Sequence, residues 1–145
     1  YRMLRYDKIV RPIAISIIRN GDSMLVYERE DDITGEKFYR LVGGCIEFGE
    51  ASSTALEREF QEELSLQIEN SKLTSVFESI FTFNSKKMHE VVFLYSSEFK
   101  DSSNYRKSII NGLEGARSFE AIWLPIADFL NYKYKIYPKE IVEYL

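Results

Sequence analysis

The sequence has 145 residues, 45% of them hydrophobic, which predicts a single domain over residues 1–145 with a core that needs no disulfide. Its net charge of −4 argues against nonspecific binding to nucleic acid, and the lack of an apolar run of about 18 residues argues against a membrane helix. Cys45 is the only cysteine, so no internal disulfide can form and a reducing, cytoplasmic setting is expected.

The first third of the chain predicts a β-hairpin followed by a strand that ends in glycine. Residues 9–19 and 23–29 alternate apolar with polar or small side chains, and Asn20-Gly21 between them suits a type I′ turn. After a polar loop, a short strand at 38–42 runs directly into Gly43-Gly44. We therefore expect the diglycine to form a backbone corner at the end of that strand.

The hydrophobic period changes after Ser52 and predicts an α-helix. The segment TALEREFQEEL lacks glycine, proline and β-branched runs, and it consists mostly of strong helix formers. Ser52, Ser53 or Thr54 is expected to cap this helix, and Thr54 with Glu57 has the spacing of a capping box.

The second half of the chain predicts strands joined by polar connections. Long strands are expected at 73–83 and 89–96, joined by a turn at 84–87, and residues 97–117 are expected to form a long loop. The remaining predicted elements are a last strand at 119–124, a short helical turn at 125–130 and a terminal helix at 138–145. Because strand pairs separate the helices, the expected fold class is α/β or α+β with a mixed sheet.

Three carboxylates share one stripe of the predicted helix, those of Glu59, Glu62 and Glu63. The stripe borders the apolar face that must pack on the sheet, where an uncompensated carboxylate costs more than in water. A solvated acidic face is the alternative, and it explains most glutamate clusters. Glu59 and Glu63 are a repulsive i,i+4 pair, however, and a divalent cation would remove both penalties. Oxygen ligands without His or Cys favour Mg²⁺, with Mn²⁺ as a substitute.

The segment before the helix supplies complementary groups. A backbone carbonyl at Gly43-Gly44 can face the same cation, since glycine lets the main chain approach a ligand closely. Glu47 and Glu50 follow in the loop, and Arg58 is placed to reach Glu50 or to hold Glu62. A cation site beside a glycine turn is typical of phosphate-binding proteins, and it explains how an acidic chain can accept an anionic substrate.

The spacing of these residues resembles the Nudix box, which reads G-x5-E-x7-R-E-U-x-E-E-x-G-U with U apolar. The matching residues here are Gly44, Glu50, Arg58, Glu59, Phe60, Glu62, Glu63 and Leu66. Ser65 stands where the pattern has its second glycine, and Val42 stands where the common Leu-Pro-Gly-Gly has proline. Both departures lie at turns that flank the helix, and both spare every acidic position.

The resemblance implies an α/β/α sandwich that hydrolyses a nucleoside diphosphate linked to another moiety, by attack of water on a phosphorus atom. It also implies that Glu59, Glu62, Glu63 and the Gly44 carbonyl bind Mg²⁺, and that Glu50 and Arg58 hold the loop to the helix. The implied partner is a small-molecule nucleotide, with no stable nucleic-acid partner and no membrane. A Nudix-fold module that binds or senses a nucleotide without cleaving it is the alternative, and the retained acidic positions disfavour it.

Residues outside the box complete the candidate site. The general base is expected to be Glu114, Glu120 or a glutamate of the box, and for Glu114 an exposed loop carboxylate is the alternative. Arg29 resembles an arginine that contacts phosphate in some family members, although an ion pair with a neighbouring acid explains it equally well. Arg40, just before the diglycine, is a second candidate for binding substrate.

Substrate specificity is expected to lie in the loops at 30–37 and 97–117. An oxidised nucleoside triphosphate, ADP-ribose, a nucleotide sugar and a dinucleoside polyphosphate all contain the cleavable group, so these substrate classes remain open. Exposed aromatic strands would also allow a homodimer.

Overall fold

One mixed β-sheet with short helices on both sides forms the fold, and the computed structural model describes residues 8–145 of it. The elements in chain order are β1 (Val10–Asn20), β2 (Ser23–Glu30), β3 (Lys37–Arg40), β4 (Gly43–Cys45), α1 (Ser52–Leu64), β5 (Ile68–Phe83), β6 (Lys86–Phe99), η1 (Ser102–Arg106), β7 (Ile109–Glu114), β8 (Arg117–Pro125), α2 (Ala127–Leu130) and η2 (Lys139–Tyr144). The strand order is β5-β6-β1-β2-β8-β7, with β3 paired to β2 and β4 paired to β1. β1 and β6 run parallel while their neighbours are antiparallel, so the predicted mixed sheet is confirmed.

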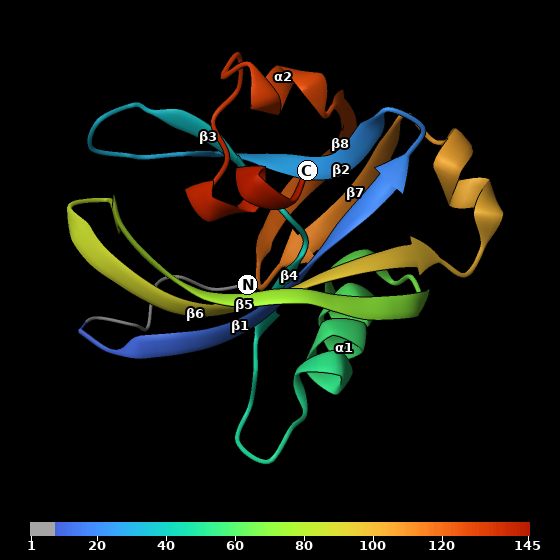
Figure 1. Ribbon diagram of the computed structural model, residues 1–145, viewed down its shortest axis with the longest axis horizontal. Coiled ribbons are helices and arrows are strands. Elements are labelled where there is room, and N and C mark those ends of the chain that lie inside the picture. Colours follow the sequence, from blue (N-terminus) through green and yellow to red (C-terminus); the bar gives the residue numbers. More distant parts are fainter. Residues whose placement is uncertain (1–7) are drawn as a thin grey trace.

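The first hairpin forms, but only at its tip. β1 pairs with β2 at Arg19 and Asn20 alone, whereas its longer part, from Val10 to Ile18, lies parallel to β6. β1 therefore joins two groups of strands that splay apart in Figure 1. The predicted turn at Asn20-Gly21 is one residue out of place, because Asn20 still belongs to β1 and Gly21, with φ of +58°, takes the first position between the strands.

The second half of the chain contains more strand than the sequence predicts. The expected loop at 97–117 is wrong for most of its length, because residues 97–99 extend β6, residues 102–106 form η1 and residue 117 begins β8. Residues 109–114 form β7, with strictly alternating exposed and buried side chains. The predicted turn at 84–87 is confirmed in place but is shorter, because residues 86 and 87 already pair in β6 and only Asn84 and Ser85, both with positive φ, connect the strands. The terminal helix is confirmed in place, although η2 is a 3₁₀ helix of 6 residues rather than an α-helix.

α1 forms where the hydrophobic period predicts it, but its ends differ from the prediction. The N-cap residue is Ala51, and no side chain caps the helix, so Ser52, Ser53 and Thr54 are not caps. At the other end Ser65 adopts the left-handed conformation, with φ of 56° and ψ of 35°, and its N–H donates to the Gln61 carbonyl at 3.0 Å. That conformation is the one for which a glycine is usual after a helix.

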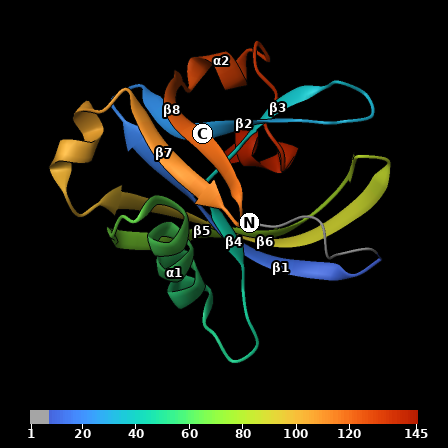
Figure 2. The same ribbon diagram turned by 180° about the vertical axis from the view of Figure 1, so that it is seen from behind.

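Two apolar clusters lie on opposite faces of the sheet. α1 buries Leu56 and Phe60 against one face, and the segment from α2 to η2 buries Phe129 and Ile141 against the other. Figures 1 and 2 show α1 and α2 on opposite sides of the strands. The arrangement is the α/β/α sandwich that the resemblance implies. Within residues 8–145, none of the helices is long and apolar enough to span a membrane.

Candidate functional site

The diglycine at the start of β4 forms a corner where two other groups approach the main chain. Gly43 has φ of +150°, and a Cβ there would lie 2.1 Å from the backbone oxygen of Ala14 on β1. At Gly44, a Cβ would lie 2.4 Å from the carboxyl carbon of Glu59. Neither distance is sterically possible, so glycine at 43 admits β1 and glycine at 44 admits the Glu59 carboxylate.

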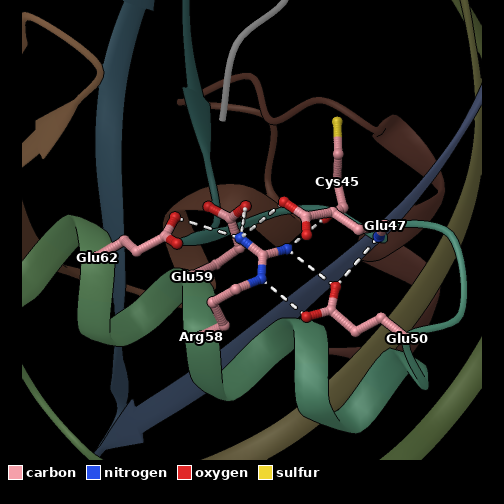
Figure 3. A network of polar contacts seen from close by, with 6 residues as sticks. All are labelled: Cys45, Glu47, Glu50, Arg58, Glu59 and Glu62. Carbon is pink, nitrogen blue, oxygen red and sulfur yellow. Dashed lines mark hydrogen bonds and ion pairs between the residues drawn. The ribbon is translucent and has the colours of Figure 1, made fainter.

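Arg58 connects this corner to α1, as Figure 3 shows. Its Nε and Nη2 donate to the two carboxylate oxygens of Glu50 at 2.8 and 3.0 Å, and Nη2 also donates to the Cys45 carbonyl at 2.9 Å. Its Nη1 donates to Glu59 at 3.0 Å and to Glu62 at 3.2 Å. The bidentate contact lowers the pKa of Glu50 and raises that of Arg58. The sequence offers Glu50 or Glu62 as the partner of Arg58, and in the structure Arg58 contacts both.

The loop before α1 is also closed by its own backbone. The Glu47 N–H donates to the Glu50 carboxylate at 3.1 Å, and the Glu50 N–H donates to the Glu47 carbonyl at 3.0 Å. The Glu47 carboxylate is 69% exposed and lies 3.8 Å from Arg58. Glu50 therefore holds the loop, whereas the Glu47 side chain adds only a weak surface ion pair.

The acidic stripe of α1 divides into a buried pair and an exposed member. Glu59 and Glu63 are 9% and 5% exposed, whereas the Glu62 side chain is 58% exposed. Burial raises the pKa of Glu59, against the opposing effect of Arg58. Burial, together with the charges of Glu59 and Glu114, raises the pKa of Glu63 to about 8. The alternative interpretation, a solvated acidic face, is therefore right for Glu62 and wrong for Glu59 and Glu63.

Glu114 lies close to this pair although it is distant in sequence. It is the last residue of β7 and is 9% exposed, so the alternative of an exposed loop carboxylate is wrong. Arg29 donates to its Oε1 at 2.9 Å, and the Tyr27 hydroxyl donates to its Oε2 at 3.4 Å. The ion pair that the sequence offered as an alternative for Arg29 therefore exists. A contact between Arg29 and substrate stays a prediction.

Arg40 lies in a second buried ionic group, in the space between β1, β3 and β6. Glu90 is fully buried and accepts from both Arg40 and Arg11 at 3.3 Å. The Arg40 guanidinium also lies over the Phe81 ring, 5.5 Å from its centroid. Burial lowers the pKa of Arg40 against the opposing charges of Glu90, Glu114 and Glu63, so Arg40 lies within electrostatic reach of Glu114 and Glu63. Its role in binding substrate stays a prediction.

The remaining candidates are less central. Glu120 is exposed in the middle of β8, where it pairs with Asn111 of β7, and it has no hydrogen bond to the residues of the box among those described. Over residues 8–145, no three or more His, Cys, Asp or Glu side chains converge closely enough to form a ready metal cluster. The chemistry of Glu59 and Glu63 nevertheless suits a hard cation, because both are buried oxygen ligands on one helix and Glu59 lies against the glycine corner.

Sequence reasoning missed three buried polar residues of the site: Tyr27, Arg11 and Glu90. A usable signal exists for two of them, because Arg11 and Glu90 are charged residues at inward positions of otherwise apolar strands. Such a position requires a buried partner. No comparable signal marks Tyr27, since tyrosine is common in strands.

A comparison with family models decides which family this is. The NUDIX domain model matches residues 10–145. The chain belongs to the NUDIX family. The match covers the box and all the strands of the sheet. NUDIX hydrolases act on small nucleotide-containing molecules and generally use divalent metal ions.

Solved structures with the same fold support this assignment. MutT from Methanosarcina mazei Go1 is 17% identical with a TM-score of 0.61, and the alignment covers 96% of this chain and 94% of that one. MutT studied from Aliivibrio salmonicida and Vibrio cholerae is 21% identical with a TM-score of 0.56, covering 94% and 96%. A NUDIX hydrolase from Nitrosomonas europaea is 18% identical with a TM-score of 0.59, covering 86% and 78%. At these identities the likeness establishes the NUDIX fold.

Proposed function

We propose that this NUDIX domain is a Mg²⁺-dependent pyrophosphohydrolase. Its substrate is a nucleoside diphosphate linked to another moiety, and water attacks a phosphorus atom of the pyrophosphate. The observation that supports the proposal best is the pair of buried carboxylates on α1, Glu59 and Glu63, of which Glu59 lies against a corner where only glycine fits. Each of the two buried carboxylates makes ionisation of the other more costly, and a bound cation would lower that cost.

The residues that would hold the ion are Glu59, Glu62, Glu63 and the carbonyl of Gly44. Glu62 is the exposed member, so it is free to rotate from Arg58 toward an ion at the corner. Bound there, Mg²⁺ would neutralise the pyrophosphate oxygens and withdraw charge from the phosphorus, and Mn²⁺ would substitute for it. Arg58 and Glu50 keep α1 and its loop in register, so the two buried carboxylates keep their place at the corner.

Glu114 is the proposed general base. It lies on a different element from the box, and its charge acts on Glu63, so it borders the corner without belonging to the proposed ligands. A carboxylate there can accept the proton of a water that attacks phosphorus, and the proton then leaves to solvent. Arg40 supplies positive charge on the same side of the sheet and is proposed to favour the phosphates of the substrate, whereas the Arg29 guanidinium is already paired with Glu114.

The test combines a substrate panel with a matched pair of variants. Oxidised nucleoside triphosphates, ADP-ribose, nucleotide sugars and dinucleoside polyphosphates are assayed with Mg²⁺ and with Mn²⁺, and the products are identified by chromatography. Glu63→Gln should reduce turnover at least about 100-fold, because one anionic ligand is lost. Glu57→Gln, on the exposed face of α1, should leave turnover unchanged.

Two results would refute the proposal. Equal turnover in Glu63→Gln and in the unaltered protein would remove the buried carboxylates from the mechanism. Calorimetric binding of a nucleotide in Mg²⁺, with no product from any compound, would instead favour a module that binds nucleotide without cleaving it.

A further inference from the structure

Two neighbouring side chains of β2 bind one carboxylate of β7. Tyr27 and Arg29 are two residues apart, so they project from the same face of their strand. The Arg29 Nη1 donates to one oxygen of Glu114 at 2.9 Å, and the Tyr27 hydroxyl donates to the other at 3.4 Å. The strand β8 lies between β2 and β7 in the sheet, so these side chains cross it. Each oxygen of Glu114 thus has its own donor.

The Tyr27 ring is held by its own packing. Tyr27 is 1% exposed, and its ring lies 4.5 Å, centroid to centroid, from that of Phe119 on β8. Phe119 pairs with Gly112 on β7, where a Cβ would lie 2.4 Å from the end of the Phe119 ring. The glycine therefore makes room for Phe119, and Phe119 supports Tyr27. Burial and the nearby charge of Glu114 raise the pKa of Tyr27 well above its ordinary value, so the hydroxyl keeps its proton.

The Arg29 guanidinium is held by an aromatic ring as well as by Glu114. Its side chain is 7% exposed, and the guanidinium lies over the Phe83 ring, 5.1 Å from the centroid. The planar group is thus stacked on an aromatic ring of β5 while it donates to a carboxylate of β7.

We propose that Tyr27 and Arg29 are positioning residues that hold the Glu114 carboxylate in one orientation, with Phe119 and Gly112 as their support. This rests on the proposed function of Glu114 as the general base. A base acts only when its oxygen meets the attacking water at hydrogen-bond distance, so loss of orientation lowers the rate of the chemical step. Because the two residues act through Glu114, they affect kcat and leave KM unchanged.

A double-mutant cycle tests the Tyr27 arm. Tyr27→Phe should lower kcat about 5- to 10-fold with KM unchanged, since one long hydrogen bond to a charged group is lost. In a Glu114→Gln background the same substitution should have no further effect. Loss of a base costs about 10²- to 10⁴-fold, so rates in that background are measured with enzyme in excess over substrate. Tyr105→Phe, which removes a tyrosine hydroxyl that accepts the Phe99 N–H elsewhere, is the control and should leave kcat unchanged.

A second pair of variants tests the Arg29 arm. Arg29→Gln should lower kcat more than Tyr27→Phe does, and Arg29→Lys should recover part of the loss, because it restores a cation for Glu114. A rise in KM with kcat unchanged would assign Arg29 to substrate binding and overturn its positioning role. Thermal unfolding of each variant separates these effects from loss of the fold.

The outcomes distinguish this proposal from the proposed function. Full activity of Glu114→Gln, or an equal effect of Tyr27→Phe with and without Glu114, would overturn the positioning proposal. Both results are compatible with a Glu63-dependent hydrolase, which the Glu63→Gln and Glu57→Gln pair tests separately.

Discussion

Ser65, at the end of α1, occupies a conformation that disfavours its side chain. Its φ of 56° and ψ of 35° lie in the left-handed region, where Cβ crowds the following carbonyl. The residue is exposed, and its N–H already closes the helix on Gln61, so the backbone geometry is set by the helix end. Ser65→Gly removes the crowded Cβ while it keeps that backbone bond. We therefore predict that the substitution stabilises the protein.

The size of the effect follows from two opposing terms. A non-glycine residue in the left-handed region costs about 1–2 kcal/mol. Glycine also stabilises the unfolded chain by about 0.4–1 kcal/mol, because it has more conformational freedom there, and this reduces the gain in folding free energy. The net stabilisation is about 0.5–1 kcal/mol, which corresponds to a rise in Tm of about 1–4 °C for a chain of this length. Calorimetry and urea unfolding of the two proteins measure it.

Ser65→Ala is the matched control. It removes the hydroxyl but keeps the Cβ, so it should not raise Tm. Equal stabilisation by alanine and glycine would show that the hydroxyl, and not the backbone conformation, destabilises this position. A loss of stability in Ser65→Gly would refute the assignment of left-handed strain to Ser65.

Three further substitutions or conditions test the site itself. Gly44→Ala should lower kcat at least about 10-fold, because the new Cβ would displace the Glu59 carboxylate, and steady-state kinetics would contradict this if kcat were unchanged. Arg58→Lys should lower Tm by about 3–6 °C in thermal unfolding, since lysine cannot donate to both oxygens of Glu50. An unchanged Tm would mean that the contacts of Arg58 with Glu50 do not stabilise the fold. Because burial raises the pKa of Glu63 from 4.5 to about 8, its protonated form contributes stability that is complete below about pH 4.5 and is lost as the pH rises through 8. Urea unfolding without metal should therefore show a decline over this window that Glu63→Gln makes shallower, and equal slopes in the two proteins would contradict the burial effect.

Part of the fold was predictable because local patterns determine it. The two strands of the first hairpin, the strand β8 and the helix from residue 52 follow from hydrophobic period and helix propensity. β7 was missed because residues 97–117 are mostly polar and contain Gly112 and Gly115, although the strand needs glycine at 112 to admit the Phe119 ring. The absence of a side-chain cap on α1 was equally hidden, since the sequence offers three good caps and the structure uses Ala51.

The amino-acid sequence alone determined which side chains α1 presents and how they are spaced. A helical turn is a local structure, so the spacing of Glu59, Glu62 and Glu63 in the sequence is enough to place all three on one face of the helix. Only the tertiary structure decided which of them are buried, and that Arg29 meets Glu114. These two residues are 85 positions apart in the chain, and a strand order of β2-β8-β7 brings them within 2.9 Å. Burial and long-range contact depend on how sheets and helices pack, and packing is a property of the whole chain rather than of any local pattern.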